Sequence, residues 1–497
     1  MLLFFFLPAM ATVNATEKEF DIVNYGAKPD GKTLNTEAIQ KAIDAAAIAG
    51  GTVVVPQGRF LTGSIILKSN VHLRLEKDAV LLGSTNPENY KRLNRWPALI
   101  LADGQENISI TGQGTIDGQG RRLALNIDSL FYAGELDSSK YTLRRKRPNE
   151  SVRPQDIEMA KCKNVLIQGI TIRNAASWVQ TYHHCENLTF DQVHVDSDAY
   201  WNNDGFDISD CKDVRVSNCV VNAADDGICL KSHVKGTWNE NVLIENCTVR
   251  SSASAIKFGT ASRGGFKNVT IRNIKVYDTF RSAIAIESVD GGELENILVD
   301  GIDAVNTGNA IFIRLGHRNA EGDVGYLKNV TIKNVKVQVA FDRPDINYEV
   351  RGPEPSFFHN TFPSTIAGIP GHRVENVLLE NIEITFPGKG NDGLAYSPVS
   401  RLNHIPEQEA DYPEFSMFGE LPAWGFYVRH VKGLRFKNVT VKAEHRDYRP
   451  AFVFDDVESL SMEQITVVED DTGPQVILKD VKDENLKMDR QMIQTIR

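Results

Sequence analysis

The chain has 497 residues, of which 41% are hydrophobic and 24% are charged, so it can bury a large core and is neither a disordered segment nor a disulfide-stapled peptide. Its 65 acidic residues outnumber its 55 basic ones, and the formal net charge of -10 argues against a nucleic-acid or anionic-membrane surface. The same balance is unfavourable for a polyanionic substrate, unless positive charge is concentrated locally.

The N-terminal residues 1–16 are an apolar run followed by small residues, which is typical of a secretory signal peptide, although the charged n-region is missing. The run is too short to span a bilayer, which takes about 20 apolar residues. We therefore expect a secreted or periplasmic protein with no membrane span, folded from residues 17–497.

Residues 36–49 carry apolar side chains at helical spacing, and Asn35 or Thr36 can cap the start while Gly50 and Gly51 end it. The apolar positions are Ile39, Ala42, Ile43 and Ala46. We expect this short helix to cap one end of the repeats that follow, because an open stack of repeats exposes apolar side chains.

A repeat fills most of the chain. Asn or Asp is followed by two short runs in which apolar and polar residues alternate, as in NVLIQGITI from Asn164 and NVLIENCTV from Asn241. The repeats that begin at Asn164, Asn187, Asp213, Asn241, Asn268 and Asn296 start 23 to 28 residues apart. Period-two alternation indicates strands, and a step of this length without helices between the strands indicates a solenoid. Leucine-rich repeats are excluded because the L-x-x-L-x-L frame is absent. We predict an all-β protein with a single right-handed parallel β-helix.

Stacked coils place equivalent positions of successive repeats in columns about 4.8 Å apart. Cys162, Cys185 and Cys211 hold one such position, and Cys219 and Cys247 hold another. We expect buried, stacked free thiols here, because disulfides need a closer approach of the Cβ atoms than ideal stacking gives. With no C-x-x-C pair there is no sign of a zinc site, and we expect neither metal nor cofactor.

Three insertions interrupt the repeats near residues 119–155, 340–372 and 388–428. The first contains the basic run Arg144 to Arg147. The other two are rich in aromatic residues that can either stack on sugar rings or cover sheet edges, among them Phe357, Phe358, Tyr412, Phe415, Phe418, Trp424 and Tyr427. Segments of this length are usually functional or disordered.

Two acidic motifs lie about one coil apart. Asp204 belongs to WNNDGFD, and Asp225 and Asp226 belong to AADDGICLK. Coils of a β-helix bring such motifs together, and a bend before Gly227 lets both neighbouring aspartates face solvent. Crowded carboxylates raise at least one pKa, which provides a proton donor beside an ionised partner, as glycoside hydrolysis requires. A calcium site and solvated turn residues are the competing interpretations.

At these residues the chain resembles glycoside hydrolase family 28, the polygalacturonase and rhamnogalacturonan hydrolase family, which has a pectin-lyase-like solenoid fold. The resemblance extends from DIVNYGAKPDGKTLNTEAIQKAI to about residue 470, and its specific part is N-N-D-G followed one coil later by D-D-G-I. It implies that Asp225 is the general acid, that Asp204 and Asp226 orient and activate the water, and that the anomeric carbon is inverted.

Two motifs of the family are replaced. Ala253-Ser254-Ala255 stands where the family has G-H-G, and Ala285-Ile286-Glu287 stands where it has the R-I-K that binds the substrate carboxylate. We expect other polar residues to bind substrate, although a solvated surface charge is the alternative for each basic one. The candidates are Asn202, Lys231, Lys257, Arg281 and Arg314. In the aligned segments GICLKS, AIKFGT, AIAIES and AIFIRL, the column that holds Lys231, Glu287 and Arg314 points outward.

The sequence therefore predicts an inverting, exo-acting glycosidase that cleaves galacturonic-acid-containing pectic polysaccharides or oligosaccharides as a monomer. Long loops favour the exo mode because they close a cleft into a pocket. Two alternatives stay open: a β-helix polysaccharide lyase, which needs a cation or arginine and a base, and a carbohydrate-binding protein or adhesin without activity.

Overall fold

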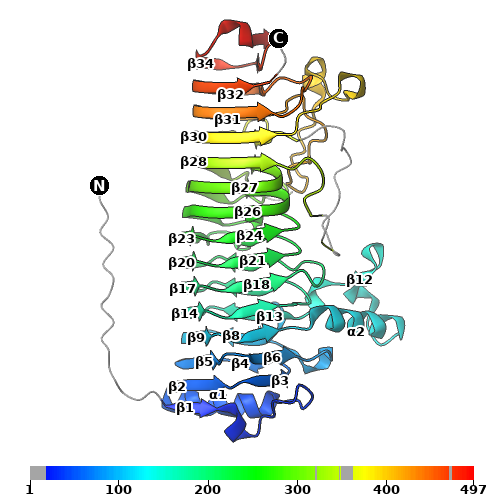
Figure 1. Ribbon diagram of the computed structural model, residues 1–497, viewed down its shortest axis with the longest axis vertical. Coiled ribbons are helices and arrows are strands. Elements are labelled where there is room, and N and C mark those ends of the chain that lie inside the picture. Colours follow the sequence, from blue (N-terminus) through cyan, green and yellow to red (C-terminus); the bar gives the residue numbers. More distant parts are fainter. Residues whose placement is uncertain (1–17, 320–321, 346–347, 349–361, 470–472, 497) are drawn as a thin grey trace, which may run out of the picture.

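The chain forms a tall stack of coils in the computed structural model, which describes residues 18–319, 322–345, 348, 362–469 and 473–496 (Figure 1). The strands pair in parallel with those of the coils before and after, and they form three columns, here called the first, second and third sheets. The fold is the right-handed parallel β-helix predicted from the repeat. The proposed signal segment 1–16, Phe357 and Phe358 lie outside the described residues.

Most coils contribute one separate strand to each sheet. The first sheet contains β1 (Glu19–Asp21), β2 (Gly51–Val55), β5 (Val71–Leu75), β9 (Glu106–Gly112), β14 (Lys163–Gln168), β17 (Glu186–Asp191), β20 (Lys212–Ser217), β23 (Asn239–Glu245) and β34 (Lys482–Lys487). The second contains β3 (Gly58–Thr62), β6 (Ala79–Gly83), β10 (Thr115–Asp117), β15 (Thr171–Arg173), β18 (His194–Ser197), β21 (Val220–Ala223) and β24 (Thr248–Ser251). The third contains β4 (Ile65–Ile66), β8 (Pro97–Asp103), β13 (Gln155–Ala160), β16 (Gln180–His183), β19 (Phe206–Ser209), β22 (Ile228–Ser232), β25 (Ile256–Ser262), β29 (Ser364–Ala367), β33 (Val476–Lys479) and β35 (Ile493–Ile496).

In the later coils the strands run on from one sheet into the next. They are β26 (Gly265–Ser288), β27 (Glu293–Leu315), β28 (Tyr326–Val339), β30 (Val374–Phe386), β31 (Phe426–Ala443) and β32 (Phe452–Val468). The short β7 (Lys91–Arg92) pairs antiparallel with β8, and β11 (Tyr141–Thr142) forms a hairpin with β12 (Arg147–Pro148).

Asparagine begins the repeat because its backbone and its side chain are both used there. Asn164, Asn187 and Asn241 have φ between 54° and 57°, a left-handed conformation that asparagine tolerates better than most residues. Each side chain also bonds to the equivalent residue of the coil before, as in the 2.8 Å bond from Asn187 Nδ2 to Asn164 Oδ1. The asparagines therefore turn the chain and hold successive coils in register.

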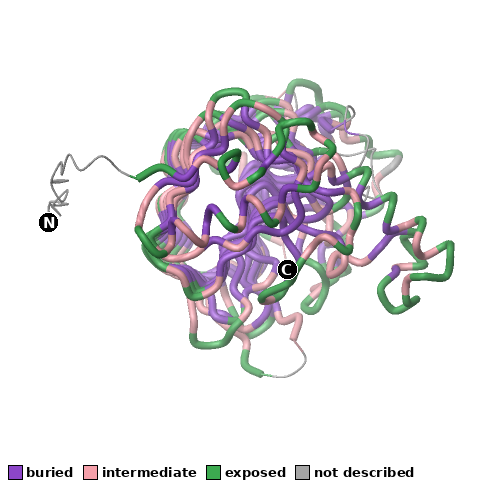
Figure 2. Tube along the Cα trace, turned by 90° about the horizontal axis from the view of Figure 1, so that it is seen from below, coloured by how far each residue is buried: buried purple, intermediate pink, exposed green. Residues whose placement is uncertain are grey.

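The interior of the stack is a continuous apolar core that runs along its axis (Figure 2). The predicted helix is α1 (Thr36–Ala49), and its four apolar positions are fully buried against the first coils. Asn35 takes the N-cap position, but its side chain accepts from the Lys28 NH instead of capping the helix. Burial of this apolar face closes the lower end of the stack.

The six cysteines are free and buried. Cys162, Cys185 and Cys211 stack on consecutive coils, with the Cys162 NH 3.3 Å from Cys185 Sγ and the Cys185 NH 3.4 Å from Cys211 Sγ. The predicted column of core thiols is therefore confirmed.

Two insertions project from the same side of the stack (Figure 1). Residues 119–155 contain α2 (Gly120–Tyr132), which the sequence analysis did not predict, and the β11–β12 hairpin. Residues 388–428 pack over the third sheet of the later coils and bury a second apolar cluster there, which includes Ala285, Phe312, Phe415, Phe418 and Tyr427. None of the described helices is long and apolar enough to cross a membrane.

Candidate active site

The two acidic motifs meet at one edge of the third sheet, where the chain enters β19 and β22. Phe206 pairs with Ile228, so Asp204 is level with Asp226 of the next coil. The Gly205 NH donates to the Asp226 carbonyl (2.9 Å), and the Asp225 NH donates to the Asn203 carbonyl (3.3 Å). The structure thus places Asp204 next to Asp225 and Asp226 of the following coil. The chain bends at residues 224–227.

Lys231 binds one side of this acidic cluster. Its Nζ lies 3.0 Å from Asp204 Oδ2, 2.6 Å from Asp207 Oδ1 and 3.0 Å from Cys229 Sγ. Burial raises the pKa of Asp204 well above its usual range and that of Asp207 to about 6, against the attraction of Lys231. A metal ion bound by these three acidic and thiol groups would have to displace the ammonium that already contacts each of them.

Lys257 binds the other side. Its Nζ lies 3.5 Å from Asp226 Oδ2 and 3.9 Å from Glu287 Oε2, and it donates to Tyr412 Oη at 3.1 Å. Burial disfavours the ionised form of Asp226, but Lys257 outweighs it, together with Lys231, and holds the pKa of Asp226 below its ordinary value. Asp226 is therefore the aspartate that is most readily ionised.

Asp225 differs from both neighbours because it has no ion-pair partner within the described part of the chain. It is half-buried, and its carboxyl accepts from Asn202 Nδ2 at 3.4 Å and from the Asp226 NH at 3.1 Å. Burial and the charge of Asp226 raise the pKa of Asp225, against the attraction of Arg281. The pKa values of two adjacent carboxyls are thus shifted in opposite directions, and Asp225 holds its proton more tightly than Asp226 does.

Arg153 positions Asn202. This fully buried arginine donates to Asn202 Oδ1 (2.8 Å) and to the carbonyls of Trp201 (2.6 Å) and Ala176 (2.7 Å). With its oxygen held by Arg153, the Asn202 amide turns its NH₂ toward Asp225. The insertion at 119–155, which supplies Arg153, therefore reaches Asp225 through one intermediate side chain.

Arg281 lies on the side of Lys257 and is almost fully buried. Its Nε is 3.3 Å from Glu414 Oε2, and its guanidinium lies over the Tyr412 ring. Among the described residues its Nη1 has no hydrogen-bond partner. A buried guanidinium nitrogen without an acceptor is a candidate ligand for a carboxylate or hydroxyl of a bound sugar.

A sequence model of the family described as glycosyl hydrolases family 28 matches residues 46–341, more than half of the chain. The chain belongs to this family. It is 26% identical over 337 residues to a probable polygalacturonase of Vitis vinifera, covering 64% of this chain and 60% of that protein. It is 28% identical over 381 residues to an exo-poly-alpha-D-galacturonosidase of Dickeya chrysanthemi, covering 66% and 63%.

The match thus spans about three fifths of the length of these two relatives. Among solved structures, the family 28 exopolygalacturonase of Yersinia enterocolitica is similar over 96% of this chain and 79% of its own, with a TM-score of 0.62 and 20% identity. At that identity the likeness bears on the fold alone, and it agrees with the β-helix described above.

One replaced family 28 motif contacts Asp226, and the other contacts Lys257, the partner of Asp226. Ser254, at the histidine position of G-H-G, donates its backbone NH to Asp226 Oδ1 at 3.1 Å. Glu287, at the lysine position of R-I-K, is buried, and burial raises its pKa to about 8, against the attraction of Lys257. An acidic residue in this family 28 protein therefore occupies a position that is basic in the motif.

Arg314 lies apart from the aspartates, which differs from our expectation. Its column is as predicted, because Glu287 pairs with Arg314 in the third sheet. However, the insertion at 388–428 covers it, and its guanidinium donates to the carbonyls of Gly368 (2.7 Å), Glu407 (2.7 Å) and Gln408 (3.0 Å). Arg314 thus holds the insertion at 388–428 in place and is not part of the proposed substrate site.

The sequence analysis did not propose Asp207, Arg153 or Trp201 as site residues, and it named Glu287 only as a replacement in the R-I-K motif. Asp207 had a usable signal: it is two residues before Ser209 on the same face of β19, and Ser209 pairs with Lys231 of the next coil. Arg153 and Trp201 had none, since neither belongs to the alternating part of a repeat.

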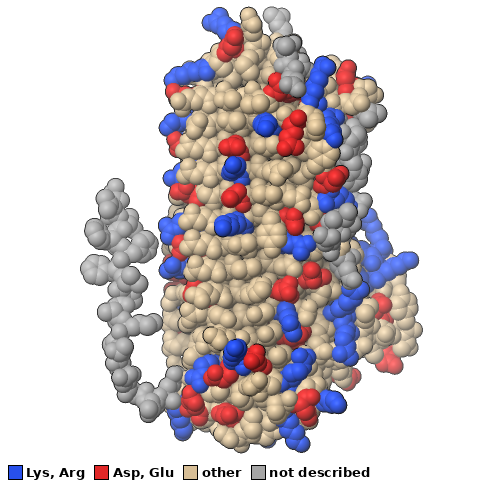
Figure 3. Space-filling view, in the orientation of Figure 1, with Lys and Arg blue, Asp and Glu red and all other residues tan. Residues whose placement is uncertain are grey.

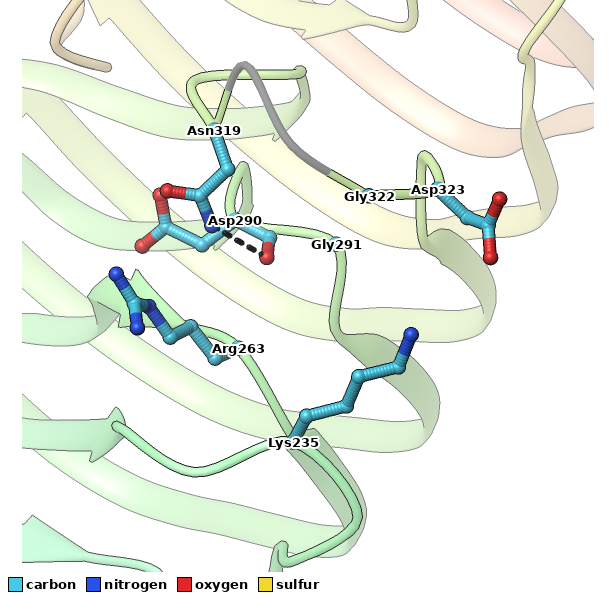
Figure 4. Close-up of a pocket in the computed structure, with 7 residues that line it drawn as sticks. All are labelled: Lys235, Arg263, Asp290, Gly291, Asn319, Gly322 and Asp323. Carbon is cyan, nitrogen blue, oxygen red and sulfur yellow. Dashed lines mark hydrogen bonds between the residues drawn. The ribbon is translucent and has the colours of Figure 1, made fainter.

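A separate hollow of about 410 Å³ lies at the turns that follow the third sheet. It is lined by residues that include Lys235, Arg263, Asp290 and Asn319 (Figure 4). Asn319 Nδ2 donates to the Asp290 carbonyl at 2.8 Å, and Arg318 binds the Asp290 carboxylate through two nitrogens. Its two acidic residues are Asp290, which is paired with Arg318, and Asp323, so the hollow lacks the adjacent pair of aspartates found at Asp225 and Asp226.

Proposed function

We propose that this family 28 protein hydrolyses glycosidic bonds of galacturonic-acid-containing pectic polysaccharides or oligosaccharides with inversion. The observation that carries the proposal is a difference between two adjacent carboxyls: Asp226 is ion-paired with Lys257, and Asp225 has no ion-pair partner among the described residues. Asp225 gives its proton to the glycosidic oxygen as the bond to the anomeric carbon breaks. Asp226, with Asp204 orienting the water, takes a proton from the water that attacks the opposite face.

We further propose an exo mode and an extracellular or periplasmic site of action as a monomer. The insertion at 388–428 packs on the third sheet around Ala285 and Phe312, so a polymer lying on that sheet ends at the insertion. The apolar N-terminal run and a pectic substrate, which is an extracellular polymer, support export. Asn202 and Arg281 are the proposed sugar ligands, and Lys231 and Lys257 act through the aspartates they bind.

The activity test uses homogalacturonan, rhamnogalacturonan and their oligosaccharides. We expect new reducing ends in the form of mono- or disaccharides and an inverted anomer in the first minutes of an NMR time course. We expect no increase in near-ultraviolet absorbance and no effect of a chelator on the rate. Absorbance from a new double bond would identify a lyase instead, random oligomers would exclude the exo mode, and binding without any new reducing end would identify a carbohydrate-binding protein.

The pH dependence of activity should follow from the two carboxyls. Asp226 must be ionised, so activity is lost as pH falls through its lowered pKa, and Asp225 must be protonated, so activity is lost as pH rises through its raised pKa. Lys257→Met removes the cation beside Asp226, and the acidic limb of kcat should move up by about one to three pH units. Lys163→Met, which removes a surface ion pair with Glu186, is the control and should leave the profile unchanged. An acidic limb that stays in place in Lys257→Met would show that Asp226 is not the base.

A further inference from the structure

Two exposed aromatic side chains lie near the aspartates and are linked to them through different partners. Trp201 is 36% exposed and directly precedes Asn202, whose amide donates to Asp225. Tyr412 is 48% exposed, and its Oη accepts from Lys257, the partner of Asp226. Each ring is thus one residue away from one of the two reacting carboxyls.

Each ring is also held by buried cations. The Arg147 guanidinium lies 4.6 Å from the Trp201 ring centroid, and Arg147 itself is 6% exposed. Lys257 Nζ lies 5.0 Å and the Arg281 guanidinium 5.7 Å from the Tyr412 ring centroid. A ring fixed by a buried cation keeps its orientation while the rest of its surface stays open to a ligand.

We propose that Trp201 and Tyr412 are the platforms on which the two sugar rings on either side of the cleaved bond stack. This inference rests on the proposed function. A pyranose ring has an apolar face of C–H groups and a rim of hydroxyls, and a tryptophan or tyrosine ring beside polar groups suits both. Because Trp201 is linked to Asp225 through Asn202 and Tyr412 is linked to Asp226 through Lys257, a disaccharide unit that contacts both rings would have its glycosidic oxygen near the two carboxyls.

The surroundings of Trp201 and Tyr412 differ in charge. The insertion that holds Trp201 carries the exposed Arg144, Arg145 and Lys146, and basic side chains gather along the side of the molecule from which it projects (Figure 3). On the Tyr412 side the cation Arg281 is already paired with Glu414. An acidic polymer should therefore extend past Trp201 along the insertion at 119–155, while one sugar fills the Tyr412 side.

The test measures oligogalacturonide binding to Asp225→Asn by calorimetry and hydrolysis by the active enzyme. Trp201→Ala and Tyr412→Ala should each weaken binding and raise KM by about tenfold, the range expected for a lost aromatic contact. Lengthening the oligosaccharide should strengthen binding to the Tyr412→Ala background more than to the Trp201→Ala background. Tyr412→Phe keeps the ring and loses only the hydroxyl contact with Lys257, so it should weaken binding less than Tyr412→Ala does.

Two exposed aromatics serve as matched controls, one on the insertion that contacts Trp201 and one on the insertion that contains Tyr412. Tyr132→Ala on α2 and Tyr396→Ala on the insertion at 388–428 should leave KM unchanged. Wild-type affinity and KM in both Trp201→Ala and Tyr412→Ala would overturn the platforms, while the proposed function would still stand on the loss of turnover in Asp225→Asn. If the wild-type enzyme releases no sugar from any pectic substrate but Trp201→Ala still weakens binding, the platforms stand and hydrolysis is wrong.

Discussion

Asp225→Asn should lower kcat by about 10²- to 10⁴-fold, the usual contribution of a general acid, and leave the fold intact. Asparagine keeps the size of the side chain and can still meet Asn202 and the Asp226 NH, but it cannot give a proton to the leaving oxygen. Because the pKa of Asp225 is raised in the folded state, its ionised form is disfavoured there, and the neutral amide should be as stable as wild type or slightly more so at pH 7.

A comparison of leaving groups separates loss of the acid from a general disturbance of the site. An aryl glycoside of the same sugar with an activated leaving group needs little protonation, so Asp225→Asn should lose far less activity on it than on an oligogalacturonide. The control is Asp196→Asn, an exposed aspartate on β18 of the coil before, which should behave as wild type. Equal losses on both substrates, or retained activity on the oligosaccharide, would remove Asp225 as the acid.

Alternation along the strands was enough to predict most of the framework of this site. Because side chains of a strand point to alternate faces, the register that aligns Ile228 with Ile256 also turns Lys257 outward beside the aspartates. The distance of about one coil between Asp204 and Asp225 then leaves no other place for the two motifs than neighbouring turns. Those parts of the prediction depend only on the repeat, which the apolar core enforces at every coil.

The contacts that the sequence did not predict depend on the segments that cover the strands. Lys257 meets Tyr412, which follows 155 residues later in an insertion without a period, and Arg281 meets Glu414 from the same segment. The same insertion covers Arg314 and supplies two of the three carbonyls that accept from its guanidinium, and Gly368 supplies the third. Periodicity predicts the direction in which a side chain points. Whether that side chain contacts substrate, another charge or the protein's own backbone depends on the path of the long loops.

Lys231→Met should lower the free energy of unfolding by about 3–5 kcal/mol at pH 7, because it leaves Asp204 and Asp207 buried without their shared cation. The loss should depend on pH. Without Lys231 the pKa values of both carboxyls rise further above their unfolded values, so the folded state binds more protons than the unfolded state between about pH 4 and 7, and stability falls as pH rises. The deficit relative to wild type should therefore be small near pH 4 and largest near pH 7, measured as the shift in denaturant midpoint.

Two further variants show whether the buried charge is the cause. Lys212→Met removes an exposed ion pair with Glu240 and should cost less than about 1 kcal/mol at either pH. Adding Asp207→Asn to Lys231→Met removes one of the two uncompensated carboxylates, and it should restore part of the lost stability at pH 7 while changing little near pH 4. If Lys231→Met is as stable as wild type at pH 7, or if its deficit is the same at both pH values, Lys231 does not hold the acidic cluster together, and the protonation states proposed for the active site need a different origin.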